Sequence, residues 1–370
     1  MWLQLFLFLF ALIVYNYYQS IGDTEINRHR YVTWLIVMLV LQSALRNYAV
    51  GSDTFSYYRD FEYTNEFRSW SIIWQNFYDV YVLGEGKDAG YLLLMKAFGT
   101  ICPSFRIYLF VIAICFFVPL FRLLESKLSS LKQLYMSFCV YQVMFYSFFS
   151  ITGLRQTIAT IATIFGIKFI EERKLWRFVL VIFLASFIHK SVFLFLPFYF
   201  IVRLPYSRKI LLITLCSLPF IFGLARPLAI WMVDVSGAET YRMYAESEME
   251  TGGAANFCIF ICAAAILTLA AKYRNPDKIP DMLVFAMALA IIFTPMMWVD
   301  TSLMRVIQYY SIFSVWGIPL AIDNLGISVS TRKVIYTMVI IVFIYTTIRH
   351  NYEYAFYWQE MKLEQHIFSK

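Results

Sequence analysis

Runs of about 17–22 mostly apolar residues follow one another along almost the whole chain. Each run is long enough to cross the hydrocarbon core of a bilayer as a helix, and no polar stretch between them is long enough for a separate soluble domain. Of the 370 residues, 61% are hydrophobic and only 15% are charged. Because helices satisfy their own backbone hydrogen bonds in lipid, the sequence predicts an all-α polytopic membrane protein.

The predicted spans cover residues 2–20, 31–48, 104–121, 133–151, 156–170, 210–225, 256–271, 281–298, 306–322 and 334–349. Met1–Val14 lacks a basic leader and a small-residue cleavage site, so we assign it to the first span. With the apolar segment 178–202, the predicted number of transmembrane helices is about 11–12. They are expected to form a single integral membrane domain, residues 1–350, followed by a C-terminal tail, residues 351–370.

Basic residues cluster between alternate spans, which the positive-inside rule assigns to the cytoplasm. The side predicted to be cytoplasmic collects 17 Lys and Arg against 8 Asp and Glu, and the other side collects 14 against 16. This asymmetry predicts that both termini lie outside.

Segment 178–202 has basic flanks at both ends and carries His189 and Lys190 in its middle. A single crossing would place these two side chains near the bilayer centre and would leave one basic flank on the wrong side. Two short half-helices that meet near His189, at the floor of an outward-open cavity, satisfy both observations. The sequence therefore predicts a broken hairpin there.

Two outer segments are longer than the rest, residues 49–103 and 226–255. Apolar and aromatic residues recur at helical spacing across Ser69–Leu83, which predicts an amphipathic helix lying at the membrane interface. The second segment is acidic and is a candidate lid. Most of the Trp and Tyr side chains are expected to form an interfacial aromatic belt, although such rings also offer stacking faces for sugars.

The least easily explained ionisable residues lie in two apolar runs. Arg155, followed by Gln156, opens a span from the outer side, where its planar guanidinium matches a pair of phosphate oxygens. An interfacial arginine extending to lipid headgroups is the alternative. His189 and Lys190, followed by Ser191, suit an anion site or proton transfer better than a purely structural role. His189 is also a candidate base for a sugar hydroxyl.

Other candidates lie near the predicted outer ends of spans. Arg46 precedes Asp53, which is either a general base or the N-cap of a following helix. Arg305 opens a later span with Tyr309 one turn on, either as part of a phosphate clamp or as a surface charge of little weight.

Several classes of site have no support in the chain. No P-loop or dinucleotide-binding glycine motif occurs, and the six cysteines show no metal-ligand spacing. The net charge of +7 is distributed as a topology signal, so no nucleic acid partner is expected. The sequence predicts no metal and no cofactor. An enzyme of this kind needs an energised substrate already in the membrane, such as a lipid pyrophosphate.

Five runs in order, spanning residues 46–313, resemble the EpsG family of Wzy-like polysaccharide polymerases. They are RNYAVGSDTFSYYRDF, DAGYLLLMKAF, GLRQTIATIATIFGIKFIEERK, FLASFIHKSVFLFLPFYFI and RVIQYYSIF. The Arg-Gln and His-Lys-Ser elements are the most specific parts of the match. The prediction gives no role to Asp88, in the second run.

The resemblance implies a GT-C-like membrane glycosyltransferase in the bacterial inner membrane, with its site on the periplasmic face. It would move glycan from undecaprenyl pyrophosphate onto a lipid-linked repeat unit, without a metal. By position, the resemblance implies His189, Asp53 and Arg155 as catalytic residues, with His189 or Asp53 as the base. The implied substrate-binding residues are Arg46, Gln156, Lys190, Arg305 and Tyr309. A chain-length regulator and a flippase are the protein partners that such a role admits, beside membrane lipid.

Three alternatives remain open. A flippase for lipid-linked sugars predicts internal repeats and charges along a path through both leaflets, and neither is evident. An O-antigen ligase uses the same donor with a lipid-A-core acceptor, so the chemistry of the residues does not separate it from a polymerase. An acyltransferase would also be built from outer-face Arg and His residues.

Overall fold

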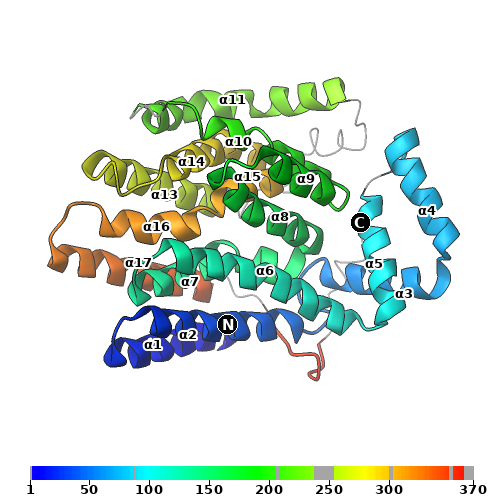
Figure 1. Ribbon diagram of the computed structural model, residues 1–370, viewed down its shortest axis with the longest axis horizontal. Coiled ribbons are helices and arrows are strands. Elements are labelled where there is room, and N and C mark those ends of the chain that lie inside the picture. Colours follow the sequence, from blue (N-terminus) through cyan, green and yellow to red (C-terminus); the bar gives the residue numbers. More distant parts are fainter. Residues whose placement is uncertain are drawn as a thin grey trace. The chain divides into compact units, whose positions relative to one another are not determined.

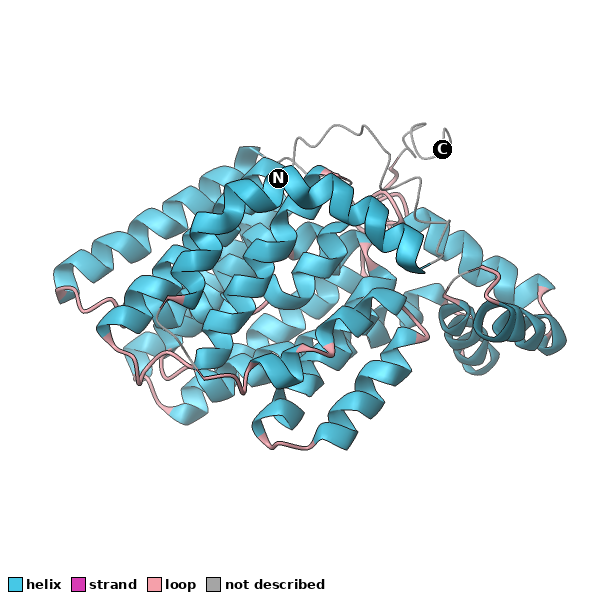
Figure 2. Cartoon of the chain, turned by 90° about the horizontal axis from the view of Figure 1, so that it is seen from above, coloured by secondary structure: helices cyan, strands magenta, loops and turns pink. Residues whose placement is uncertain are grey.

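A computed structural model describes residues 2–86, 88–205, 209–236, 254–299, 303–349 and 353–361. Within these ranges every regular element is a helix, and the one β-type pairing is an isolated antiparallel bridge between Arg46 and Phe356 (Figure 2). The predicted all-α polytopic class is confirmed.

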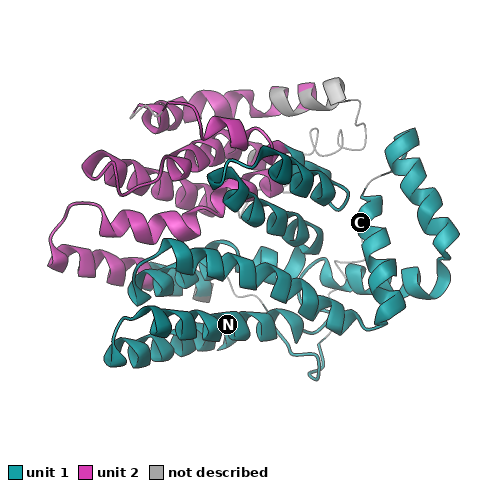
Figure 3. Ribbon diagram, in the orientation of Figure 1, with its two compact units in different colours: residues 1–193, 341–370 teal, residues 194–340 magenta. Residues whose placement is uncertain are grey.

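The chain divides into two compact units: residues 1–193 with 341–370 form unit 1, and residues 194–340 form unit 2 (Figure 3). The helices of unit 1 are α1 (Trp2–Ile21), α2 (Glu25–Ala44), α3 (Thr54–Phe67), α4 (Trp70–Tyr78), η1 (Asp79–Leu83), α5 (Ala89–Ile101), α6 (Phe105–Lys127), α7 (Leu131–Met144), η2 (Tyr146–Thr152), α8 (Leu154–Glu171) and α9 (Leu175–Ser186). Those of unit 2 are α10 (Phe198–Ile201), α11 (Ile210–Ser236), α13 (Ala254–Arg274), α14 (Asp281–Phe293), η5 (Thr294–Trp298), α15 (Met304–Ser311) and α16 (Ser314–Asp323) (Figure 1). Two helices, η3 (Lys190–Phe195) and α17 (Val329–Arg349), begin in one unit and end in the other. The single domain expected for residues 1–350 stays a prediction.

Five of the described helices are long and apolar enough to cross a membrane: α1, α6, α11, α13 and α17. A sixth span arises if α7 and η2, which meet at a bend of 71°, count as one. This number is smaller than the predicted 11–12, because several predicted spans are interrupted helices. Segment 281–298 changes from α14 to the 3₁₀ helix η5 at Thr294, and segment 306–322 is divided by a turn between α15 and α16.

The predicted break in segment 178–202 is present. Helix α9 ends at Ser186, and the backbone then turns, with the His189 N–H donating to the Ala185 carbonyl oxygen at 3.0 Å. The short 3₁₀ helix η3 begins at Lys190. A change of helix type in mid-segment places these polar residues at an irregular stretch of backbone, where such groups are tolerated in membranes. The return of the second half to the same side stays a prediction.

The predicted hairpin determines from which side of the membrane a reagent can reach position 190. A cysteine replacing Lys190 should react with a membrane-impermeant thiol reagent from the outer side and be protected from the inner side, because a cavity open to the outside exposes it. The measurement is side-specific labelling in oriented vesicles, with the exposed Trp176 replaced by cysteine as the inner-side control. Labelling of the Lys190→Cys protein from the inner side would exclude the hairpin.

The described residues of segment 49–103, which is predicted to lie outside, fold into three α-helices and the π-helix η1, with both α3 and α4 packed on α5. Ser69 caps α4 by accepting a hydrogen bond from the Ile72 N–H at 3.4 Å. Ile73 is buried, whereas Trp70 and Trp74 are exposed. The helix predicted over Ser69–Leu83 is therefore formed by α4 and η1, and its exposed tryptophans fit the predicted place at an interface.

The second predicted outer loop, residues 226–255, begins later than expected. Helix α11 continues to Ser236 through the first part of this range. Residues 237–253 of the predicted loop lie outside the described residues. The predicted lid is therefore not described.

The C-terminal segment 353–361 is tied by its backbone to the end of α2. The Asn47 N–H donates to the Ala355 carbonyl at 2.8 Å, and the Tyr357 N–H donates to the Leu45 carbonyl at 3.0 Å. Two reciprocal hydrogen bonds around one bridge hold the tail in a fixed register. We call residues 353–361 the C-terminal strap.

Candidate active site

A partly buried ion pair joins the starts of two helices of unit 1. Asp88 directly precedes α5, and Arg155 is the second residue of α8. The guanidinium Nη1 of Arg155 lies 3.0 Å from Oδ2 of Asp88. The Asp88 side chain is only 7% exposed, and that of Arg155 is 32% exposed. Removing charged groups from water costs free energy, and ionisable residues in such surroundings often serve a function. This ion pair therefore marks a candidate site.

His189 joins this pair from the turn that follows α9. Its Nδ1 lies 3.7 Å from the same Oδ2 of Asp88, and its side chain is 10% exposed. Arg155 and His189, both predicted from the sequence, are therefore brought together by Asp88, which was not. The sequence signal for Asp88 was weak: one carboxylate among many in an acidic outer segment, immediately before an apolar helix.

The backbone around Asp88 holds it in place. Asp88 has φ 55° and ψ 37°, a left-handed conformation that few residues other than glycine adopt. Two residues on, Gly90 lies so close to Phe187 that a Cβ at Gly90 would fall 2.4 Å from the Phe187 carbonyl oxygen. The hydroxyl of Tyr81 donates to that same carbonyl at 2.7 Å. The start of α5 is thus fixed against the turn that carries His189.

Aromatic rings surround the cations of the site. The Arg155 guanidinium carbon lies 5.6 Å from the ring centroid of Tyr57 and 5.4 Å from that of Tyr91. Lys190 Nζ lies 5.8 Å from the ring centroid of Tyr81. These distances allow cation–π attraction, which holds a cation in place without consuming its hydrogen-bond donors.

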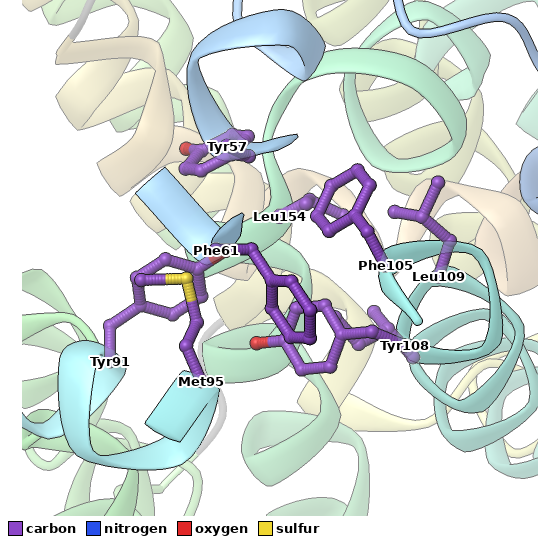
Figure 4. Packing of buried hydrophobic residues seen from close by; sticks show 9 residues of the cluster. Tyr57, Phe61, Tyr91, Met95, Phe105, Tyr108, Leu109 and Leu154 are labelled. Atoms are coloured by element: carbon purple, nitrogen blue, oxygen red, sulfur yellow. The ribbon is translucent and has the colours of Figure 1, made fainter. Parts of the chain in front are cut away.

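The two tyrosines beside Arg155 belong to a hydrophobic cluster that anchors the site. Figure 4 shows Tyr57 from α3, Tyr91 and Met95 from α5, and Leu154, the neighbour of Arg155, packed in one cluster with residues of α6. Each of these side chains is at most 7% exposed. Because close-packed interiors resist displacement, this cluster fixes Arg155 relative to Asp88.

Opposing effects act on the Asp88 carboxyl, which lies ahead of α5 in the segment predicted to lie outside the membrane. Burial raises its pKa, but the nearby His189 imidazole and the Arg155 guanidinium together outweigh burial, so the pKa lies below its ordinary value. Asp88 is therefore ionised at neutral pH. The stability that this pair contributes is present at neutral pH and is lost only as the pH falls through the lowered pKa.

Arg46 is fully buried and is tied to its own surroundings. It donates to the Ser43 carbonyl oxygen, and its Nε donates to Thr54 Oγ1 at 3.3 Å. The Thr54 hydroxyl in turn donates to the Ile151 carbonyl at 2.9 Å, just ahead of α8. These contacts connect the end of α2 with the start of α3 and with η2.

The remaining predicted residues lie in different surroundings. Gln156 is buried beside Arg155 in α8. Asp53 is half-buried before α3, and its side chain makes no capping hydrogen bond there. Arg305 and Tyr309 lie on α15 of unit 2, where Tyr309 is fully buried. The structure thus gathers Arg155, His189 and Lys190 around unit 1 elements, and the roles predicted for the others stay predictions.

No group of three or more His, Cys, Asp or Glu side chains among the described residues is placed to hold a metal ion. The six cysteines are free thiols. A metal-independent reaction stays a prediction.

These features define an all-helical integral membrane protein with a buried carboxylate–arginine–histidine cluster. The sequence model of the EpsG family matches residues 29–363. The chain therefore belongs to the EpsG family. Comparison with curated proteins and with solved structures finds no match.

Proposed function

We propose that this protein is a polysaccharide repeat-unit polymerase. It transfers glycan from undecaprenyl pyrophosphate onto a lipid-linked repeat unit at the outer face of the bacterial inner membrane. Membership of the EpsG family supports a polymerase-like membrane protein. Recurrent apolar helices support a substrate that is delivered within the bilayer.

The observation that supports the proposal most is the hydrogen bonding of the Arg155 guanidinium group. Its Nη1 is paired with Asp88, but its buried Nε has no hydrogen-bond partner among the described residues. A buried donor without a partner costs about 1–3 kcal/mol, so a ligand acceptor at this position would be stabilising. A phosphate oxygen is the acceptor that a guanidinium binds best.

In the proposed reaction, negative charge develops on the pyrophosphate as the bond to the sugar breaks. Arg155 is placed to stabilise that charge, and Lys190, which lies against the Tyr81 ring, supplies a second positive charge. Of the rings beside these cations, Tyr81 is only half-buried and so keeps surface that a sugar can contact. No nucleotide is needed, because the donor already carries its leaving group, and the proposed reaction is metal-independent.

The proposal is tested by supplying the purified protein in liposomes with undecaprenyl-pyrophosphate-linked repeat units alone. We expect a ladder of longer lipid-linked glycans without nucleotide sugar and in the presence of a metal chelator. In cells lacking the protein, we expect single capped repeat units in place of the ladder. An intact ladder that accumulates on the carrier lipid would indicate a ligase. Repeat units trapped on the cytoplasmic leaflet would indicate a flippase.

A further inference from the structure

The two oxygens of the Asp88 carboxylate have different surroundings. Oδ2 faces both cations of the site, with Arg155 Nη1 at 3.0 Å and His189 Nδ1 at 3.7 Å. Oδ1 is buried and has no hydrogen-bond partner among the described residues. In the same ion pair, Arg155 Nε is a buried donor that also has no hydrogen-bond partner among the described residues. One ion pair thus keeps one acceptor and one donor available to a ligand.

Asp88 Oδ1 and Arg155 Nε determine which hydrogen-bonding groups a ligand at this position must carry. An unpartnered carboxylate oxygen that is more than nine-tenths buried needs a donor, and a hydroxyl group is a suitable one. An unpartnered guanidinium nitrogen needs an acceptor, preferably anionic. A ligand complex that offers a hydroxyl next to a phosphate oxygen satisfies both, and a glycosyl transfer from a pyrophosphate brings these two groups together.

We propose that Asp88 Oδ1 binds the attacking hydroxyl of the acceptor sugar and takes its proton. This inference rests on the proposed polymerase function. The acceptor oxygen forms a bond to the anomeric carbon of the donor glycan, and the bond from that carbon to the pyrophosphate oxygen breaks. The electron pair leaves with undecaprenyl pyrophosphate, and the proton passes to Asp88, which later returns it to water.

This assignment gives His189 a different task. With its Nδ1 toward Oδ2, His189 acts with Arg155 to hold that oxygen and so fixes the direction in which Oδ1 points. It is a positioning residue for Asp88. Asp53 lies before α3 and makes no capping hydrogen bond there. Under this proposal the base is Asp88, whereas the sequence predicted His189 or Asp53.

The first test replaces Asp88 by asparagine, which keeps the size and removes the base. In the liposome assay we expect kcat to fall by about 10²–10⁴-fold. The KM for the lipid-linked donor should be unchanged or lower, because Arg155 loses its competing carboxylate. The exposed Asp60→Asn protein, from α3, is the control and should retain wild-type kcat. An Asp88→Asn protein with kcat within threefold of wild type, or with a loss carried by KM alone, would overturn the assignment.

The second test uses the wild-type protein and does not depend on a variant that folds. The groups that face Asp88 are Arg155 from α8, His189 after α9 and Tyr81 from η1, with Lys190 against the Tyr81 ring. With Asp88 as the base, the rate should stay level as the pH falls from 7 to 5, since its pKa lies below the ordinary value. With a histidine base, the rate would fall about tenfold per pH unit below roughly 6.5, which would overturn the proposal.

The two proposals fail in different ways. Wild-type protein that extends no lipid-linked glycan would overturn the polymerase function, and the role of Asp88 with it. Extension by wild type together with an active Asp88→Asn protein would overturn the role of Asp88 alone.

Discussion

Replacing Arg155 by alanine should abolish long polymer while the protein remains inserted in the membrane. Its side chain neutralises buried Asp88 and keeps a donor for the leaving group, so the expected loss is about 10²–10³-fold in kcat. The Arg155→Lys protein should recover little of the lost activity, because an ammonium group lacks the planar pair of donors that a guanidinium offers. The measurement is the length distribution of lipid-linked glycan, with protein amount in the membrane determined in parallel.

The control for this prediction is Arg59→Ala, an exposed arginine on α3 of the same outer segment. It removes the same charge at a surface position, where single charges contribute little. Normal polymer length in the Arg155→Ala protein would contradict the site assignment. Loss in both proteins to the same extent would indicate a general effect of charge instead.

Gly90→Ala should have the second large effect, through geometry alone. The added methyl group would lie 2.4 Å from the Phe187 carbonyl oxygen and 2.6 Å from the Phe187 Cβ, so the start of α5 has to move. Overpacking of this kind costs about 1–3 kcal/mol of stability. Because Asp88 precedes α5 by one residue, a shift of about 1 Å should lower kcat by about 10²-fold.

This prediction is checked by measuring kcat and thermal stability together, beside Gly223→Ala in α11. No atom lies within 4 Å of a Cβ at Gly223, so that control should keep full activity and gain about 0.5–1 kcal/mol of helix stability. If the Gly90→Ala protein kept wild-type stability and rate, the close contact between α5 and Phe187 would not be what positions Asp88.

The sequence predicted those parts of the site whose signals are local. An arginine at the head of an apolar run and a His-Lys pair inside another are anomalous wherever the helices pack, so Arg155, His189 and Lys190 could be identified without a structure. The break after Ser186 could be predicted for the same reason.

Asp88 could not be identified, because its significance lies in contacts across 67 and 101 residues of chain. Charge counting assigned it to an acidic outer segment together with six other carboxylates. The number of described helices long and apolar enough to span a membrane, five or six, is lower than the predicted 11–12 for a related reason. The hydropathy of an apolar run does not show where its helix is interrupted. It therefore does not reveal the change from α-helix to 3₁₀ helix at Thr294 or the turn between α15 and α16.

The C-terminal strap has a consequence for how the chain threads the membrane. Because residues 355–357 pair with residues 45–47 at the end of α2, we expect these two stretches to lie on one side of the bilayer. The number of crossings between them is therefore even, whatever that number is. Apart from segment 178–202, the sequence predicts eight spans in this interval. With those eight predicted spans, a single crossing by 178–202 would make the total odd, so an even number of crossings agrees with the predicted hairpin, in which this segment enters and leaves on the same side.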